Sequence, residues 1–192
     1  MIAAERVAVV LLAAGLSTRF GVGDKLAAPL DGLALGLHAA RRFASLPFVA
    51  KIAVVGEDGP DFGSSGFETV VNPDPGAGQS GSISLGLAAA LRGEPDAVLI
   101  LLADMPFVTI AHVEALLARL DAAHPIVAST DGAHPSPPAL FAAASFTLLA
   151  DLTGDTGARA LLRTATLVAA SPAELADVDT LDDLRLVTGE TH

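Results

Sequence analysis

Short, unbroken apolar runs recur along the chain. They are rich in valine, isoleucine and leucine and do not alternate with polar residues, which is typical of strands buried on both faces of a parallel sheet. We therefore expect strands at residues 7–12, 51–55, 68–71, 97–102, 126–128 and 166–169.

Stretches with helical spacing separate most of these runs. The clearest is 110–123, where apolar residues recur every three or four positions and Thr109 stands where an N-cap belongs. Similar spacing predicts helices at 35–46 and 82–92, and Asp179 stands where a last helix begins. Alternation of buried strands with helices predicts an α/β fold, with a mostly parallel sheet covered by helices on both faces.

Four loops are candidates for a binding site, because ligands of open α/β sheets bind beyond the carboxyl ends of the strands. They are the loop after the first strand and residues 76–84, 104–106 and 134–138. The last is rich in proline, so we expect a stiff loop there. The sequence has neither an internal repeat nor an interdomain linker, and its 192 residues are expected to form a single domain, 1–192.

Composition and charge narrow the classes of function. Apolar residues make up 52% of the chain, enough for a sizeable core, and the formal net charge is -11. Such a surface repels nucleic acid and anionic membranes, so we expect neither as a partner. The absence of cysteine excludes disulfides, zinc–thiolate sites and iron–sulfur clusters. The apolar run after Arg6 is better explained by a buried strand than by a secretory signal, and we expect a cytoplasmic protein.

Two cations and several glycines follow the first strand, in the stretch LLAAGLSTRFGVGDK at 11–25. Gly15 permits a ligand to approach the main chain closely, and amides in such a turn can bind phosphate oxygens. Arg19 offers a planar fork of donors and Lys25 a point charge, which together would neutralise a polyphosphate. The loop is neither a Walker A motif nor GxGxxG, so the alternative is a loop with solvated cations.

Asp104 directly follows the buried run 97–103. A carboxylate at the end of a strand is a natural ligand for a hard cation, and magnesium held by few carboxylates suits phosphate chemistry. The alternative is a capping or salt-bridging aspartate. Because a phosphate-binding loop is expected at the same sheet edge, metal binding is the better hypothesis.

Five motifs occur in order along almost the whole chain. They are Leu12-Ala13-Ala14-Gly15 with Ser17, Arg19, Gly21, Lys25 and Leu26; Asn72-Pro73 with Gly78-Gln79-Ser80-Gly81-Ser82; Ala103-Asp104-Met105-Pro106; Gly154-Asp155-Thr156-Gly157-Ala158-Arg159; and Asp177-Val178-Asp179-Thr180 with Asp183-Leu184. Together they resemble the MobA-like nucleotidyltransferases, and most closely the molybdenum cofactor cytidylyltransferases.

The resemblance implies a Rossmann-like three-layer α/β/α sandwich of the nucleotide-diphospho-sugar transferase type. It also implies Mg²⁺-dependent transfer of CMP from CTP to molybdopterin, because an Ala-Ala-Gly opening accompanies cytidine in related enzymes. The partners would be CTP, the molybdopterin cofactor, and a molybdoenzyme or its maturation factor. Nucleotide contacts would come from Leu12, Ala13, Ala14, Gly15, Gly78, Ser80 and Ser82, triphosphate contacts from Arg19 and Lys25, and a magnesium ligand from Asp104.

Four further residues have weaker assignments. Asp179 is either a second metal ligand or, the interpretation we favour, the N-cap of the last helix. Asp155 and Arg159 are spaced i, i+4 and form either an ion pair on a helix, or an acceptor contact or loop anchor. His134 is either an acceptor contact or an exposed loop histidine. The segment 136–138 departs from the family sequence where the acceptor is expected, so this motif does not specify the acceptor.

The expected reaction is in-line attack by a terminal phosphate of the pterin on the α-phosphorus of CTP, with release of pyrophosphate. The alternatives within the fold are guanylyl transfer from GTP to molybdopterin and cytidylyl transfer to a sugar or polyol phosphate. A further alternative is a non-catalytic nucleotide-binding protein that handles the cofactor. A dinucleotide-dependent oxidoreductase is disfavoured, because GxGxxG does not follow the first strand.

Overall fold

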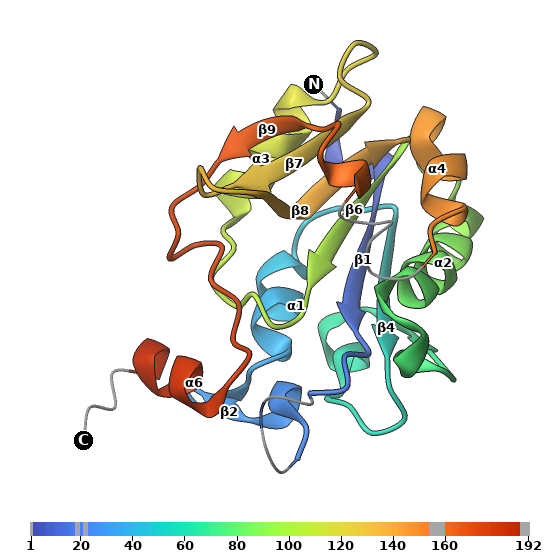
Figure 1. The fold of residues 1–192 in the computed structure, drawn as a ribbon. Helices are drawn as coiled ribbons and strands as arrows, with labels where there is room; N and C mark the ends of the chain where they lie inside the picture. The colour runs from blue at the N-terminus through green and yellow to red at the C-terminus, as the bar shows by residue number, and fades with distance from the viewer. Residues whose placement is uncertain (1, 18–19, 21–22, 154–159, 189–192) are drawn as a thin grey trace.

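The computed structural model describes residues 2–17, 20, 23–153 and 160–188. Within them the chain forms a seven-stranded sheet in the order β5-β4-β1-β6-β8-β7-β9 and a separate two-stranded hairpin (Figure 1). All the expected strands are present, and most of the strand pairs are parallel. The strands are β1 (Val7–Ala13), β2 (Pro29–Leu30), β3 (Leu33–Ala34), β4 (Ala50–Val55), β5 (Glu68–Val71), β6 (Ala97–Leu102), β7 (Ile126–Thr130), β8 (Pro135–Ala142) and β9 (Thr166–Ala169).

Helices cover both faces of the sheet, which confirms the three-layer α/β architecture (Figure 1). The odd-numbered residues of β1 pack in one core with α1 and α3, and its even-numbered residues pack in another with α2 and α4. This two-sided burial is why the strand reads as a continuous apolar run. None of the helices in the described ranges is both long and apolar enough to cross a membrane. The α-helices are α1 (Leu37–Phe43), α2 (Gln79–Ala90), α3 (Ile110–Arg119), α4 (Phe146–Ala150) and α6 (Leu181–Thr188).

Helix α2 lies unusually close to the central strands. A Cβ on Gly86 would stand 2.3 Å from Val10 Cγ1 and 3.0 Å from Val54 Cγ2, so only glycine fits at this crossing. The first residues of α2 are thereby placed beside the carboxyl end of β1, where the sequence predicts a ligand.

The prediction of a stiff loop at 134–138 is wrong, because residues 135–138 open strand β8. Strand β8 pairs antiparallel with β6 only from Ala139 onward, whereas Pro135 and Ser136 pair with β7 alone, beyond a bulge in the register. The prolines therefore lie where β8 has a partner on one side only. Proline lacks an N–H, and a strand tolerates it where no bond is needed on the other side.

Candidate functional site

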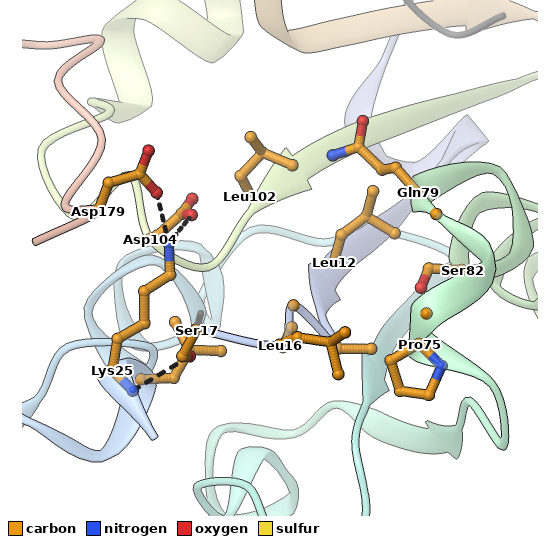
Figure 2. A pocket seen from close by; sticks show the side chains of 16 residues that line it. Leu12, Leu16, Ser17, Lys25, Pro75, Gln79, Ser82, Leu102, Asp104 and Asp179 are labelled. Atoms are coloured by element: carbon orange, nitrogen blue, oxygen red, sulfur yellow. Dashed lines mark hydrogen bonds and ion pairs between the residues drawn. The ribbon is translucent and has the colours of Figure 1, made fainter. Parts of the chain in front are cut away.

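A cleft of about 420 Å³ opens at the carboxyl ends of β1 and β6 (Figure 2). The loop after β1 forms its floor, the start of α2 forms one wall, and the segments that carry Asp104 and Asp179 lie opposite α2. The lining residues are Leu12, Ala13, Ala14, Gly15, Leu16, Ser17, Lys25, Leu26, Pro75, Gly76, Gly78, Gln79, Ser82, Leu102, Asp104 and Asp179. The fold thus brings most of the predicted site residues together.

The loop after β1 offers its backbone to the cleft. Apart from Gly15 itself and its two chain neighbours, no atom of the described residues lies within 4 Å of the position that a Cβ on Gly15 would occupy, so these residues leave the main chain open to a ligand. The chain then turns back, because Ser17 Oγ accepts a hydrogen bond from Lys25 N at 3.2 Å and Asp24 Oδ1 accepts one from Leu26 N at 3.0 Å. These bonds fix the short 3₁₀ turn η2 (Lys25–Ala27), from which the Lys25 side chain projects.

Lys25 joins two carboxylates from distant parts of the chain (Figure 2). Its Nζ lies 2.7 Å from Asp104 Oδ2 and 2.9 Å from Asp179 Oδ1, and only 9% of its side chain is exposed. A lysine this deeply buried needs such partners, since an unpaired ammonium is costly away from water. Burial alone would lower the pKa of Lys25, but the Asp104 and Asp179 carboxylates outweigh it and raise the pKa above the ordinary lysine value.

In the part of the chain that the structure describes, a third carboxylate, Asp177, lies near this ammonium and its two partners. Lost hydration, and then the charges of Asp179 and Asp104, raise the pKa of the nearby Asp177. Among the described residues, Asp104 Oδ1 also has no hydrogen-bond partner, although it is buried. Buried polar atoms of this kind are rare and call for a missing partner.

The two carboxylates fit a divalent cation. Carboxylate oxygens are the ligands that magnesium prefers, and a cation here would satisfy the orphaned Asp104 Oδ1. In the described part of the chain, no three acidic, histidine or cysteine side chains converge to hold a metal. A cation bound by Asp104 and Asp179 would therefore take its other ligands from water and from a bound phosphate, as magnesium commonly does.

The interpretation of Asp179 as the N-cap of the last helix is wrong. Thr180 caps α6 instead, because its Oγ1 accepts a hydrogen bond from Asp183 N at 3.1 Å and Asp183 Oδ2 accepts one from Thr180 N at 2.8 Å. This is a capping box, in which the cap and the third helical residue satisfy each other. The Asp179 carboxylate precedes the cap and reaches Lys25.

A small hydrophobic cluster fastens the segments of the site together. Phe20 from the first loop, Leu30 and Leu35 from the hairpin region, and Val178 are buried against one another, with Phe107 packed at the edge. Val178 N also donates to Asp104 O at 3.0 Å. Asp104 and Asp179 are therefore held side by side by backbone contact and packing as well as by Lys25.

The second motif places Ser82 in the cleft wall. Asn72 is buried, donates from Nδ2 to Ser82 Oγ at 2.9 Å and accepts at Oδ1 from Asp74 N at 2.9 Å. Gly78 has a φ of +96°, a conformation that favours glycine, and turns the chain into α2. Asn72 was missed as a site residue, although the Asn-Pro motif was a signal for it.

The remaining predicted residues do not line the cleft or lie outside the described residues. Ser80 is buried in α2 and does not line the cleft. His134 is exposed in the turn before β8 and does not line it either. Arg19, Asp155 and Arg159 lie outside the described residues.

Comparison with known proteins identifies the family. A model of the MobA-like NTP transferase domain matches residues 9–173. The chain belongs to this family. Purine catabolism protein PucB of Bacillus subtilis (strain 168) is 33% identical over 196 aligned residues, covering 91% of this chain and 89% of that protein.

Solved structures agree with the fold. The homolog of Mycobacterium tuberculosis rv0371c from Mycobacterium sp. strain JC1 superposes with a TM-score of 0.78 at 25% identity, covering 96% of each chain. The manganese complex of Rv0371C from Mycobacterium tuberculosis H37Rv gives 0.74 at 22% identity, covering 97% of this chain and 100% of that one.

Family membership makes the protein a nucleotidyltransferase with small-molecule nucleotide substrates. Family membership alone specifies neither the nucleotide nor the acceptor.

Proposed function

We propose that residues 1–192 form one catalytic domain that transfers CMP from CTP to molybdopterin, releases pyrophosphate and uses Mg²⁺. The observation that carries the proposal is the convergence of Lys25, Asp104 and Asp179 at one side of a cleft whose other side is the start of α2. A nucleoside triphosphate needs charged groups along its phosphates and a neutral wall for its base. The opening Ala13-Ala14-Gly15 supports CTP, through its resemblance to the cytidine branch of the family.

Asp104 and Asp179 would hold Mg²⁺, which when bound supplies positive charge against the charge that develops on the phosphates. Both carboxylates contact Lys25 in the structure. We infer that Lys25 leaves them when they bind the cation and turns to the triphosphate. The ammonium thus neutralises aspartates in one state and phosphates in the other, and it is never left buried without an opposite charge.

The reaction is a displacement at the α-phosphorus. A phosphate oxygen of the acceptor forms a bond to this phosphorus while the bond to the bridging oxygen of pyrophosphate breaks. The nucleophile is already anionic, so no general base is required, and no histidine of the described residues lines the cleft. Lys25 and the open backbone at Gly15 align and neutralise the phosphates, and Arg19 is proposed to share this role. Loss of one such charge contact would cost about 3 kcal/mol, roughly a hundredfold in rate.

Ser82 is suited to contact the base or ribose. Asn72 Nδ2 already donates to Ser82 Oγ, so the hydroxyl keeps its own proton to donate. We propose that Ser82 donates this proton to an acceptor on the nucleotide, and that Asn72 fixes its direction.

The test is a nucleotide panel with purified protein, Mg²⁺ and molybdopterin, followed by mass identification of the product. CTP is expected to give the CMP adduct and pyrophosphate, whereas GTP, ATP and UTP are not. A GMP adduct would move the protein to guanylyl transfer. Product with a sugar or polyol phosphate but not with molybdopterin would refute the acceptor, and no pyrophosphate with any pair would refute catalysis.

A further inference from the structure

Arg42 reaches from helix α1 to the segment that carries Asp104. Its Nη1 donates to Pro106 O and to Val108 O, both at 2.7 Å, and its side chain is half-buried. The residue lies in none of the family motifs and does not line the cleft. Its two bonds span more than sixty positions of sequence, so they tie α1 to the turn that leaves β6.

The bonded carbonyls belong to a stretch without regular secondary structure. Strand β6 ends at Leu102 and α3 begins at Ile110, so the backbone N–H and C=O groups between them do not belong to the regular hydrogen bonds of a sheet or helix. The side chains of Met105 and Val108 are 3% and 2% exposed, which buries this stretch against the core. Carbonyl groups in such a place need donors, and one guanidinium nitrogen supplies both.

The same turn is held from its other side. Val178 N donates to Asp104 O at 3.0 Å. Val178 directly precedes Asp179, whose carboxylate contacts Lys25 as that of Asp104 does. Arg42 thus fixes the carbonyls two and four positions after Asp104, while Val178 fixes Asp104 itself. With both ends held, the position of the Asp104 carboxylate relative to Asp179 is set.

We propose that Arg42 is a positioning residue, which holds the turn after β6 so that Asp104 and Asp179 can share one cation. In the structure, the two carboxylates share the ammonium of Lys25. That they share a divalent metal in the same way rests on the proposed function. Residues that orient metal ligands from behind commonly affect metal affinity by 10–100-fold when they are removed. A misplacement of about 1 Å can have a similar effect on rate.

The neighbouring Arg41 provides a matched control. It lies on the same helix turn and is exposed, so Arg41→Ala removes the same charge and makes the same change in helix propensity. Arg42→Lys keeps the charge and some donor capacity without the planar fork, so it should restore part of the function.

Two measurements test the proposal, and the first needs no metal. Hydrogen exchange should become faster at Met105 and Val178 in Arg42→Ala but not in Arg41→Ala, because their amides report on the turn. The second is titration with Mn²⁺ alone, followed by electron paramagnetic resonance. Arg42→Ala should bind about 10–100-fold more weakly than wild type, Arg42→Lys should be intermediate, and Arg41→Ala should be unchanged. Added salt should not reduce the differences, since a geometric effect is not screened.

The outcomes separate the positioning role of Arg42 from the metal site of the proposed function. Unchanged exchange in Arg42→Ala would overturn the positioning role, and so would Mn²⁺ binding by Arg42→Ala as tight as that of a wild type that binds Mn²⁺. Equal weakening in Arg41→Ala and Arg42→Ala would also overturn it, because only their charge is shared. Should Arg42→Ala fail to fold, the same comparisons are made with Arg42→Lys. Faster exchange together with a wild type that binds no Mn²⁺ would support the hold on the turn and refute the metal site of the proposed function.

Discussion

Replacement of Lys25 by methionine tests the charge balance of the site most directly. Methionine keeps an unbranched apolar side chain of similar length but removes the ammonium from between Asp104 and Asp179. The two carboxylates would then lose the ammonium that they share. We expect the variant to be less stable than wild type in a chelator and to recover when a divalent cation is added.

The size of the effect follows from burial. Removing one partner of a fully buried ion pair costs about 3–5 kcal/mol. The Asp104 and Asp179 side chains are 20% and 24% exposed, so water relieves part of this cost, and we expect about 2–4 kcal/mol. For a chain of this size that is a drop of roughly 5–15 °C in Tm. A cation at a hundred times its Kd returns about 2.7 kcal/mol, which nearly offsets the loss.

The assay is thermal unfolding of wild type, Lys25→Met and Lys51→Met in a chelator and in saturating Mn²⁺. Lys51 is the other lysine of the chain and bonds to the carbonyl of Ala44, so it controls for the loss of a lysine outside the site. Lys25→Met should gain more from Mn²⁺ than wild type does, because no ammonium competes for the carboxylates. Equal gains in all three proteins, or no loss in the chelator, would refute the reasoning.

The difference in stability between wild type and Lys25→Met should change with pH in one direction. The carboxylates raise the pKa of Lys25 in the folded state, so its stabilising effect is complete below the ordinary lysine pKa of about 10.4. It is lost as the pH rises through the higher folded value. The stability gap between wild type and Lys25→Met should therefore be constant near neutral pH and close in strong alkali.

Three further predictions concern single residues. Gly86→Ala should lower the stability by about 1–3 kcal/mol in urea unfolding, because the new methyl would stand 2.3 Å from Val10 Cγ1. Burial lowers the pKa of His112 despite the opposing charge of Glu174, so wild-type stability should fall as the pH drops below about 6.5, whereas urea titrations of His112→Gln should lack this slope. Asp179→Asn should reduce the rate of pyrophosphate release about 10–100-fold with unchanged helical circular dichroism, because Asp179 does not cap α6.

The sequence alone determined the architecture and most of the cleft. Buried strands and amphipathic helices are recorded locally, as apolar runs and as spacing, so β1, β6 and α3 could be predicted from short windows. Asp104 could be placed at the sheet edge because it ends such a run. The motifs predicted Lys25 and Ser82 for the same site, and the structure brings them into one cleft.

Only the tertiary structure decided which groups meet. Strand β8 was missed because its prolines are tolerated only where its pairing with β6 has stopped, a fact about its neighbour and not about its own residues. The choice of Thr180 over Asp179 as helix cap depended on where the chain turns, and the Lys25 ion pairs and the hold of Arg42 on Pro106 join residues far apart in sequence. Local patterns record whether a residue is buried. They do not record its partner, because packing of distant segments selects that partner.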